Sequence, residues 1–102
     1  MFAVKIVGQV CGMFSTKDGK HSFLTIATEV DPRRPLRQGD TLKPTNVEIP
    51  AGVDAGAAGL RKRVEVDAYG YMADVDWYDK QKNVTKKIEN TRLVASAIKL
   101  IG

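Results

Sequence analysis

The sequence predicts an all-β domain whose five strands close into a small barrel. Helical periodicity is almost absent, and runs of β-branched residues bounded by turn residues dominate the 102 residues. A chain of this length forms one domain with one hydrophobic core. We therefore expect a single domain over residues 1–102, in which closure removes the sheet edges that promote aggregation.

The first expected strand covers residues 2–14. Gly8 and Gly12 lie within it and indicate bulges or bends, because glycine inside a strand often marks a kink or a close approach. Phe2 and Phe14 share the even parity of the core positions on this strand. We therefore expect both phenylalanine rings to be buried.

A hairpin loop over residues 15–20 follows, because Asp18-Gly19 is a strong turn signal. The second strand covers residues 21–30, and its side chains alternate between two faces. The core face is expected to carry Ser22, Leu24, Ile26, Thr28 and Val30. The opposite face is expected to carry His21, Phe23, Thr25, Ala27 and Glu29.

The middle of the chain is expected to be mostly loop. Residues 31–46 contain three prolines and a Gln-Gly-Asp turn, and a loop of this length is commonly functional or mobile. A short third strand over residues 47–49 is stopped by Pro50. Residues 51–60 are rich in Ala and Gly, and we expect a short irregular helical turn or a loop there.

Two long strands complete the predicted barrel, over residues 63–77 and 84–100, with a hairpin at 79–83. The core face of the fourth strand is expected to carry Val64, Val66, Ala68, Gly70 and Met72. Five strands with one irregular connection between the third and fourth are the pattern of the OB-fold. Its usual binding face comprises strands 2 and 3, the first hairpin loop and the loop between strands 4 and 5.

Composition places the chain among ordinary globular proteins. It is 43% hydrophobic and 27% charged, which excludes a disordered tail or a fibrous repeat. No apolar run approaches the ~20 residues of a membrane span, and the first residues lack a signal-peptide layout. A lone Cys11 cannot form an internal disulfide. We expect a cytoplasmic protein (in the host cytoplasm if phage-encoded) that does not associate with membranes.

Catalytic and metal chemistry have little support in the sequence. His21 is the only histidine and Cys11 the only cysteine, so no zinc ligand set exists. No nucleophile–base pair and no glycine-rich phosphate loop accompanies Asp74, Asp76 and Asp79. We therefore expect a protein that is not an enzyme and has no catalytic residues, no metal and no cofactor.

Basic residues are clustered along the chain, although the net charge is only +4. Residues 64–79 contain five acids and no base, and residues 80–87 contain four bases and no acid. The clusters are typical of a solvated surface or of basic loops that follow a polyanion backbone. The basic residues expected to contact phosphates are Lys17, Lys20, Arg33, Arg34, Arg37, Lys80, Lys82, Lys86 and Lys87.

Several aromatic side chains are expected outside the core. Exposed rings on adjacent strands are typical of a stacking platform for bases, where each stacked base contributes about 1–3 kcal/mol. A subunit interface is the alternative, because Tyr and Trp are enriched there too, and the two can coexist. The predicted nucleic-acid site adds to the basic residues the side chains of His21, Phe23, Tyr69, Tyr71, Trp77 and Tyr78.

Five segments carry, in order, a resemblance to a known family: residues 4–10, 23–28, 59–66, 77–80 and 91–100. Together they resemble the single-stranded-DNA-binding proteins of the OB type. In that family a tryptophan at the corner before the last hairpin stacks on DNA. The resemblance implies that role for Trp77.

Three features depart from the family pattern. The corner before the tryptophan is acidic, Asp74-Val75-Asp76, and Val47-Glu48-Ile49 stands where the third strand usually has a tryptophan. The sequence given ends at Ile101-Gly102 without an acidic tip. These features favour resemblance to a compact phage- or plasmid-encoded binder, or to a primosomal OB protein, over a bacterial housekeeping protein.

We therefore expect a binder that coats and protects single-stranded DNA during replication or recombination, with little sequence preference. RNA stays an open alternative as the partner. A homodimer or larger homo-oligomer is expected, because one small barrel contacts few nucleotides and gains from avidity. The rival hypothesis is an OB-like protein-interaction or assembly module with its aromatic residues at a subunit contact.

Overall fold

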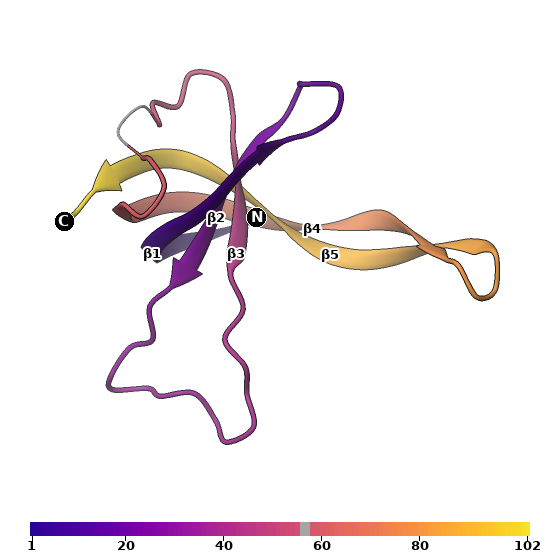
Figure 1. Cartoon of the computed structure of the whole chain (residues 1–102), viewed down its shortest axis with the longest axis horizontal. Helices are drawn as coiled ribbons and strands as arrows, with labels where there is room; N and C mark the ends of the chain where they lie inside the picture. The colour runs from indigo at the N-terminus through magenta and orange to yellow at the C-terminus, as the bar shows by residue number, and fades with distance from the viewer. Residues whose placement is uncertain (56–57) are drawn as a thin grey trace.

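The computed structural model describes residues 1–55 and 58–102, and the regular structure of these residues is all β. The strands are β1 (Phe2–Ser15), β2 (Ser22–Thr28), β3 (Thr45–Ile49), β4 (Arg63–Asp79) and β5 (Val84–Leu100). They form a closed barrel in the order β1-β2-β3-β5-β4 (Figure 1). Neighbouring strands are antiparallel except for the parallel pair β3–β5. The predicted five-stranded barrel is confirmed.

The core is built from the inward-facing side chains of the strands. Burying each of these side chains contributes about 1.5–3 kcal/mol, so the barrel interior is the main source of stability. The alternation predicted for the second and fourth strands is confirmed over the length of the barrel. The largest fully buried side chains are Leu24, Ile26, Val10, Val47, Val64 and Val66.

A bulge near Cys11 changes the side-chain parity of β1. The register between β1 and β2 shifts between Val10 and Gly12, so one extra residue of β1 is accommodated there. Before the shift Val10 faces the core. After it Phe14 lies opposite Phe23 on the outer surface, with 46% of the residue exposed. The burial predicted for Phe14 is therefore wrong, because the bulge reverses the faces of the strand.

Four other residues predicted for the core face are exposed because they lie at or beyond the end of the barrel: Phe2, Ser22, Val30 and Met72. Ser22 is the first residue of β2, and Val30 is 38% exposed because β2 ends at Thr28 rather than continuing to residue 30. The ring of Phe2 lies over Gly70, where an added Cβ would come within 2.3 Å of the ring. Phe2 keeps the predicted inner parity, but the end of the barrel leaves it exposed. Met72 is 58% exposed because β4 has already left the barrel at that point.

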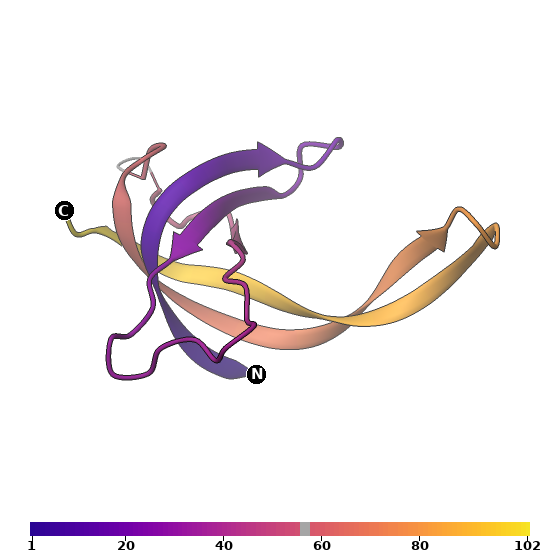
Figure 2. The same ribbon diagram turned by 60° about the horizontal axis from the view of Figure 1, so that its bottom comes forward.

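Strands β4 and β5 continue beyond the barrel as a two-stranded arm, which we define as residues 72–91. Their register is unbroken from the pair Ala68–Ala95 to the pair Asp79–Val84. Figures 1 and 2 show the two strands leaving the barrel together. The radius of gyration is 15.3 Å, above the ~13 Å of a compact domain of this length. The arm therefore projects into solvent.

The connection between β3 and β4 packs against the core without a helix in its described part. Residues 56 and 57, on which part of the predicted helical turn falls, lie outside the described residues. Single turns are closed by the Val53 N–H on the Pro50 carbonyl at 3.2 Å and by the Ala58 N–H on the Ala55 carbonyl at 2.9 Å. Ala58 is buried in the core cluster, so the segment packs as a loop.

A bidentate ion pair joins the chain just after β2 to the start of β4. Arg63 donates from Nε and Nη2 to the two carboxylate oxygens of Glu29, the second bond measuring 2.8 Å. The hydrogen bond from Arg63 holds the pKa of the Glu29 carboxyl below its ordinary value of 4.5. The pair is solvent-exposed, so its contribution to stability is small.

Because of this ion pair, the difference in stability between wild type and Glu29→Gln is expected to depend on pH. Because the pKa of Glu29 is lower in the folded than in the unfolded protein, the stabilisation is present above the unfolded value and is lost as pH falls through the folded value. Wild type is expected to be slightly more stable than Glu29→Gln at neutral pH, and the difference should shrink in acid. Denaturant unfolding over a pH series measures it, and a difference independent of pH would contradict the assignment.

Candidate functional site

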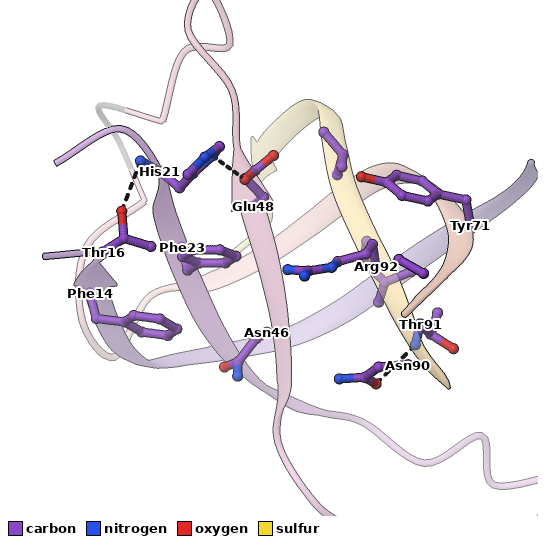
Figure 3. Close-up of a pocket in the computed structure, with 13 residues that line it drawn as sticks. Phe14, Thr16, His21, Phe23, Asn46, Glu48, Tyr71, Asn90, Thr91 and Arg92 are labelled. Carbon is purple, nitrogen blue, oxygen red and sulfur yellow. Dashed lines mark hydrogen bonds and ion pairs between the residues drawn. The ribbon is translucent and has the colours of Figure 1, made fainter. Parts of the chain in front are cut away.

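A groove of about 500 Å³ crosses one face of the barrel. Its walls come from the β1–β2 hairpin, β3 and the part of β4 and β5 where the arm begins, as Figure 3 shows. Most of the side chains that line it are aromatic or polar. The six that matter for its chemistry are Phe14, His21, Phe23, Glu48, Tyr71 and Arg92.

Two stacked phenylalanine rings form one side of the groove. Phe14 and Phe23 are directly opposite in the β1–β2 register, and their ring centroids lie 4.9 Å apart with an interplanar angle of 10°. A ring pair of this kind contributes about 0.5–1.5 kcal/mol beyond area burial. The stack presents a flat apolar surface that is fixed by two strands.

Tyr71 and Arg92 form the other side of the groove and are directly opposite each other in the β4–β5 register. Figure 3 shows the guanidinium of Arg92 extended into the groove toward the side of Phe23. No carboxylate among the described residues forms an ion pair with Arg92. Its planar set of five N–H donors is therefore available to an anion or to the face of a planar group.

Polar contacts between β2 and β3 hold the floor of the groove. His21 Nδ1 lies 2.7 Å from Glu48 Oε1, so the acid of the groove has a partner that carries positive charge when protonated. The Thr25 hydroxyl donates to Asn46 Oδ1 at 2.7 Å and fixes the amide of Asn46. These contacts orient the side chains before any ligand arrives.

The first hairpin loop, which carries Lys17 and Lys20, begins and ends next to residues that line the groove. The Thr16 hydroxyl donates to Asp18 Oδ1 at 2.5 Å, and this bond lowers the pKa of the Asp18 carboxyl. The same oxygen accepts the Lys20 backbone N–H at 3.0 Å. Thr16 and His21 line the groove at the two ends of this loop. Lys17 and Lys20 lie between them.

Three predicted ring-bearing residues, His21, Phe23 and Tyr71, line the groove, and three do not. Tyr69 lies on the outer face of β4, while Trp77 and Tyr78 lie on the arm. All three rings are exposed, which confirms that they are not core residues. The predicted aromatic platform is therefore divided between the groove, the barrel wall and the arm, and a ligand contact at the last two stays a prediction.

The predicted basic residues fall into three separate regions. Lys17 and Lys20 lie in the first hairpin loop next to the groove, and neither lines it. Arg33 and its neighbours Arg34 and Arg37 lie in the long loop between β2 and β3, which leaves the barrel on the side away from the first hairpin loop (Figure 1). Arg33 binds Asp31 at 3.3 Å and lowers the pKa of that carboxyl. The remaining lysines lie on the outer half of the arm: Lys80, Lys82, Lys86 and Lys87.

Of the six residues that matter for the chemistry of the groove, sequence reasoning missed three: Phe14, Glu48 and Arg92. The signal for Phe14 was present, because Gly12 indicates a bulge and a bulge reverses the parity of every later residue in the strand. Arg92 is an isolated base in the last strand and belongs to no charge cluster. Only the pairing of β5 with β4 brings it opposite Tyr71.

Other kinds of site find little support in the described chain. No group of three or more His, Cys, Asp or Glu residues suited to a metal ion occurs within residues 1–55 and 58–102. In the same two ranges, no helix is long and apolar enough to cross a membrane. The groove offers aromatic faces, a guanidinium and amide groups, which are binding groups.

Comparison with solved structures identifies the architecture. A crystal structure of the mitochondrial single-stranded DNA binding protein Rim1 from S. cerevisiae matches 98% of this chain with a TM-score of 0.54 and 16% identity, over 92% of its own length. The chain has this fold. A second structure of that protein matches 98% of this chain with a TM-score of 0.51 and 17% identity, over 94% of its length. No family model and no curated protein sequence matches the chain.

The fold gives the groove a defined position. It lies on the face of β2 and β3, next to the first hairpin loop and at the base of the hairpin between β4 and β5. This is the face that OB-folds commonly use for binding. The sequence-based expectation for the OB-fold is therefore confirmed, and the groove covers part of the expected face without reaching the turn between β4 and β5.

Proposed function

We propose that this chain binds single-stranded DNA in the groove, without catalysis and with little sequence preference. The observation that carries the proposal is the placement of the Phe14–Phe23 stack opposite Tyr71 and Arg92 across one groove. Bases stack on aromatic faces whatever their sequence, and a guanidinium binds phosphate or stacks on a base. The similar mitochondrial structures, described as single-stranded DNA binding proteins, support the same ligand class.

The groove favours a single strand over a duplex for a physical reason. Bases reach aromatic side chains face to face only when they are unstacked from one another, and in a duplex they are enclosed by pairing and stacking. The rings lie on strands of the barrel, so they are held in place before binding and lose little side-chain freedom. A preformed platform of this kind suits a ligand that is itself flexible.

Phosphate contacts are proposed to begin at the groove and to extend outward. Arg92 lines the groove, and Lys17 and Lys20 lie in the adjoining loop between β1 and β2. A longer strand is needed to reach the arginines of the β2–β3 loop or the lysines of the arm. Glu48 is the acid in the groove, and its partner His21 offsets its charge when protonated.

A salt series provides the direct test. If Arg92, Lys17 and Lys20 each neutralise one phosphate, log affinity for oligo-dT should fall with log salt with a slope of about −2, at roughly −0.7 per phosphate. Oligo-rU and duplex DNA of matched length are measured in parallel. Tight binding with a flat salt response, or a preference for duplex, would overturn the proposal. Equal affinity for oligo-rU would extend it to RNA.

The proposed biological role is to coat and protect single-stranded DNA during replication or recombination in the cytoplasm. The resemblance of the sequence to compact phage- or plasmid-encoded binders and to primosomal OB proteins supports this role. Self-association is part of the proposal, because one groove contacts few nucleotides and several linked grooves gain avidity.

A protein-interaction module is the second candidate function. The exposed Trp77 and Tyr78 on the arm favour it, because large aromatic residues are enriched at protein interfaces. The two functions are compatible when the groove and the arm serve different partners. A protein that self-associates but shows no measurable binding to oligo-dT would favour this candidate.

A further inference from the structure

The arm exposes apolar side chains that the barrel does not cover. A two-stranded ribbon is marginally stable by itself in water, so apolar side chains along it indicate that a partner covers the arm. These side chains occur on both strands of the arm and are 43% to 58% exposed: Met72, Trp77, Tyr78, Val84 and Ile88.

Charge is distributed unevenly along the arm. Near the barrel Asp74 lies directly opposite Glu89, which places two carboxylates side by side on one face. Like charges in this position are destabilising, and no cation among the described residues pairs with either of them. At the other end of the arm Lys80 and Lys82 lie in the turn beside Asp79, and the adjoining parts of the two strands add Asp76, Lys86 and Lys87. The end near the barrel is therefore acidic, and the outer half carries four bases against two acids.

We propose that two copies of this chain associate by laying their arms antiparallel. The turn of each arm, with Lys80 and Lys82, then lies against the barrel end of the other arm, with Asp74 and Glu89. A two-fold axis makes such a contact self-complementary, because every pairing occurs twice. Lys80 and Lys82 of one copy then meet Asp74 and Glu89 of the other. Parallel arms would bring acid against acid and base against base. The inference specifies the surface for the proposed self-association and is independent of DNA binding in the groove.

The acidic end has a surface shaped for a lysine side chain. A shallow hollow beside the two carboxylates is lined by Met72, Ala73, Asp74 and Glu89. The apolar walls suit the aliphatic stem of a lysine, and the carboxylates suit its ammonium group. The like-charge pair that is unfavourable in one copy becomes favourable when a lysine from the second copy lies between its members.

The face that carries Asp74 and Glu89 also has exposed apolar side chains. Met72 and Tyr78 lie an even number of residues from Asp74 on β4 and therefore share its face, whereas Trp77 lies on the opposite face of the arm. Met72 is 58% and Tyr78 51% exposed, and in the antiparallel arrangement the arm of the other copy covers them.

Two charge-reversed variants test the proposal. One carries Asp74→Lys and Glu89→Lys, which keeps a like-charge pair within the arm and so matches its internal repulsion. The other carries Lys80→Glu and Lys82→Glu. Wild type is expected to sediment as a dimer at tens of micromolar, and each variant alone as a monomer of half the mass. Circular dichroism confirms that both variants fold.

Mixing provides the decisive measurement. An equimolar mixture of the two variants should restore the dimer mass. The new lysines near the barrel in one variant then meet the new glutamates in the turn of the other. A monomeric wild type would overturn this inference and the proposed self-association together. Variants that stay dimeric, or a mixture that stays monomeric, would overturn the arm contact alone.

A nucleic-acid role for the arm gives a different result. In that case Lys80→Glu with Lys82→Glu lowers affinity for oligo-dT while the mass stays that of wild type, and the arm contact is overturned. Oligo-dT binding by Tyr71→Ala reports on the groove separately, because Tyr71 lines the groove and lies outside the arm. Failure of the groove and failure of the arm are therefore distinguishable.

Discussion

Replacing Phe23 or Tyr71 with alanine is expected to weaken the binding of single-stranded DNA by about 1–3 kcal/mol in each case, or roughly 5- to 150-fold in affinity. Both rings line the groove and neither belongs to the core cluster, so the loss should come from base stacking and leave folding intact. Titration of a labelled oligo-dT followed by fluorescence anisotropy measures the affinity. Thermal unfolding of the same samples reports on the fold.

Tyr69→Ala is the matched control for Tyr71→Ala. The two tyrosines lie two positions apart on β4, on the same outer face, and are 37% and 42% exposed, but only Tyr71 lines the groove. Tyr69→Ala is expected to leave affinity nearly unchanged. An equal loss for Tyr69→Ala would support the wider platform that the sequence predicts. Normal affinity in folded Phe23→Ala and Tyr71→Ala proteins would contradict binding in the groove.

The second large effect is expected for Gly8→Ala. Gly8 is buried on β1, and an added Cβ would lie 2.1 Å from the Ala27 carbonyl oxygen and 2.8 Å from its carbon. These are backbone atoms of the neighbouring strand, so they cannot rotate away as a flexible side chain can. Overpacking typically costs 1–3 kcal/mol, and we expect a loss of about 3 kcal/mol in the free energy of unfolding. Denaturant unfolding measures it.

Gly59→Ala provides the control for this substitution. The nearest atom to a Cβ at Gly59 is Lys62 Cγ at 3.9 Å, which is an ordinary van der Waals contact. The same chemical change is therefore expected to have little effect there. Wild-type stability in Gly8→Ala, or an equal loss in both variants, would contradict the close approach of β1 and β2.

Local pattern was sufficient to predict the strands and most of the core. Alternation on β2 and β4 fixes which side chains face inward, because a shift of one residue would expose the whole apolar set. Leu24, Ile26, Val64 and Val66 are buried for this reason. The two hairpin turns follow from short polar segments that suit tight turns.

The positions where strands leave the barrel were not predictable from pattern. Met72 continues the alternation of β4 without a break, but the barrel ends before it and the arm begins. Closure depends on the parallel pairing of β3 with β5 around Glu48 and Val94, which are 46 residues apart. No local signal reports a contact of that kind.

The candidate site was predicted in part for the same reason. His21, Phe23 and Tyr71 were found because the parity of a single strand places each of them outward. Arg92 enters the groove only through the pairing of two strands, and the basic loops are placed by the path of the chain. The sequence predicted several basic loops that follow a polyanion backbone, and the structure places them in three separate regions.

The bulge at Cys11 has an evolutionary consequence. One residue of strand length decides whether Phe14 faces the barrel interior or the groove. A single-codon insertion or deletion at this point can therefore give or remove half of the aromatic stack without altering any aromatic residue. Column-by-column conservation of Phe14 is consequently a poor guide to shared ligand binding among related chains. The number of residues between Val10 and Phe14 is the better character to compare.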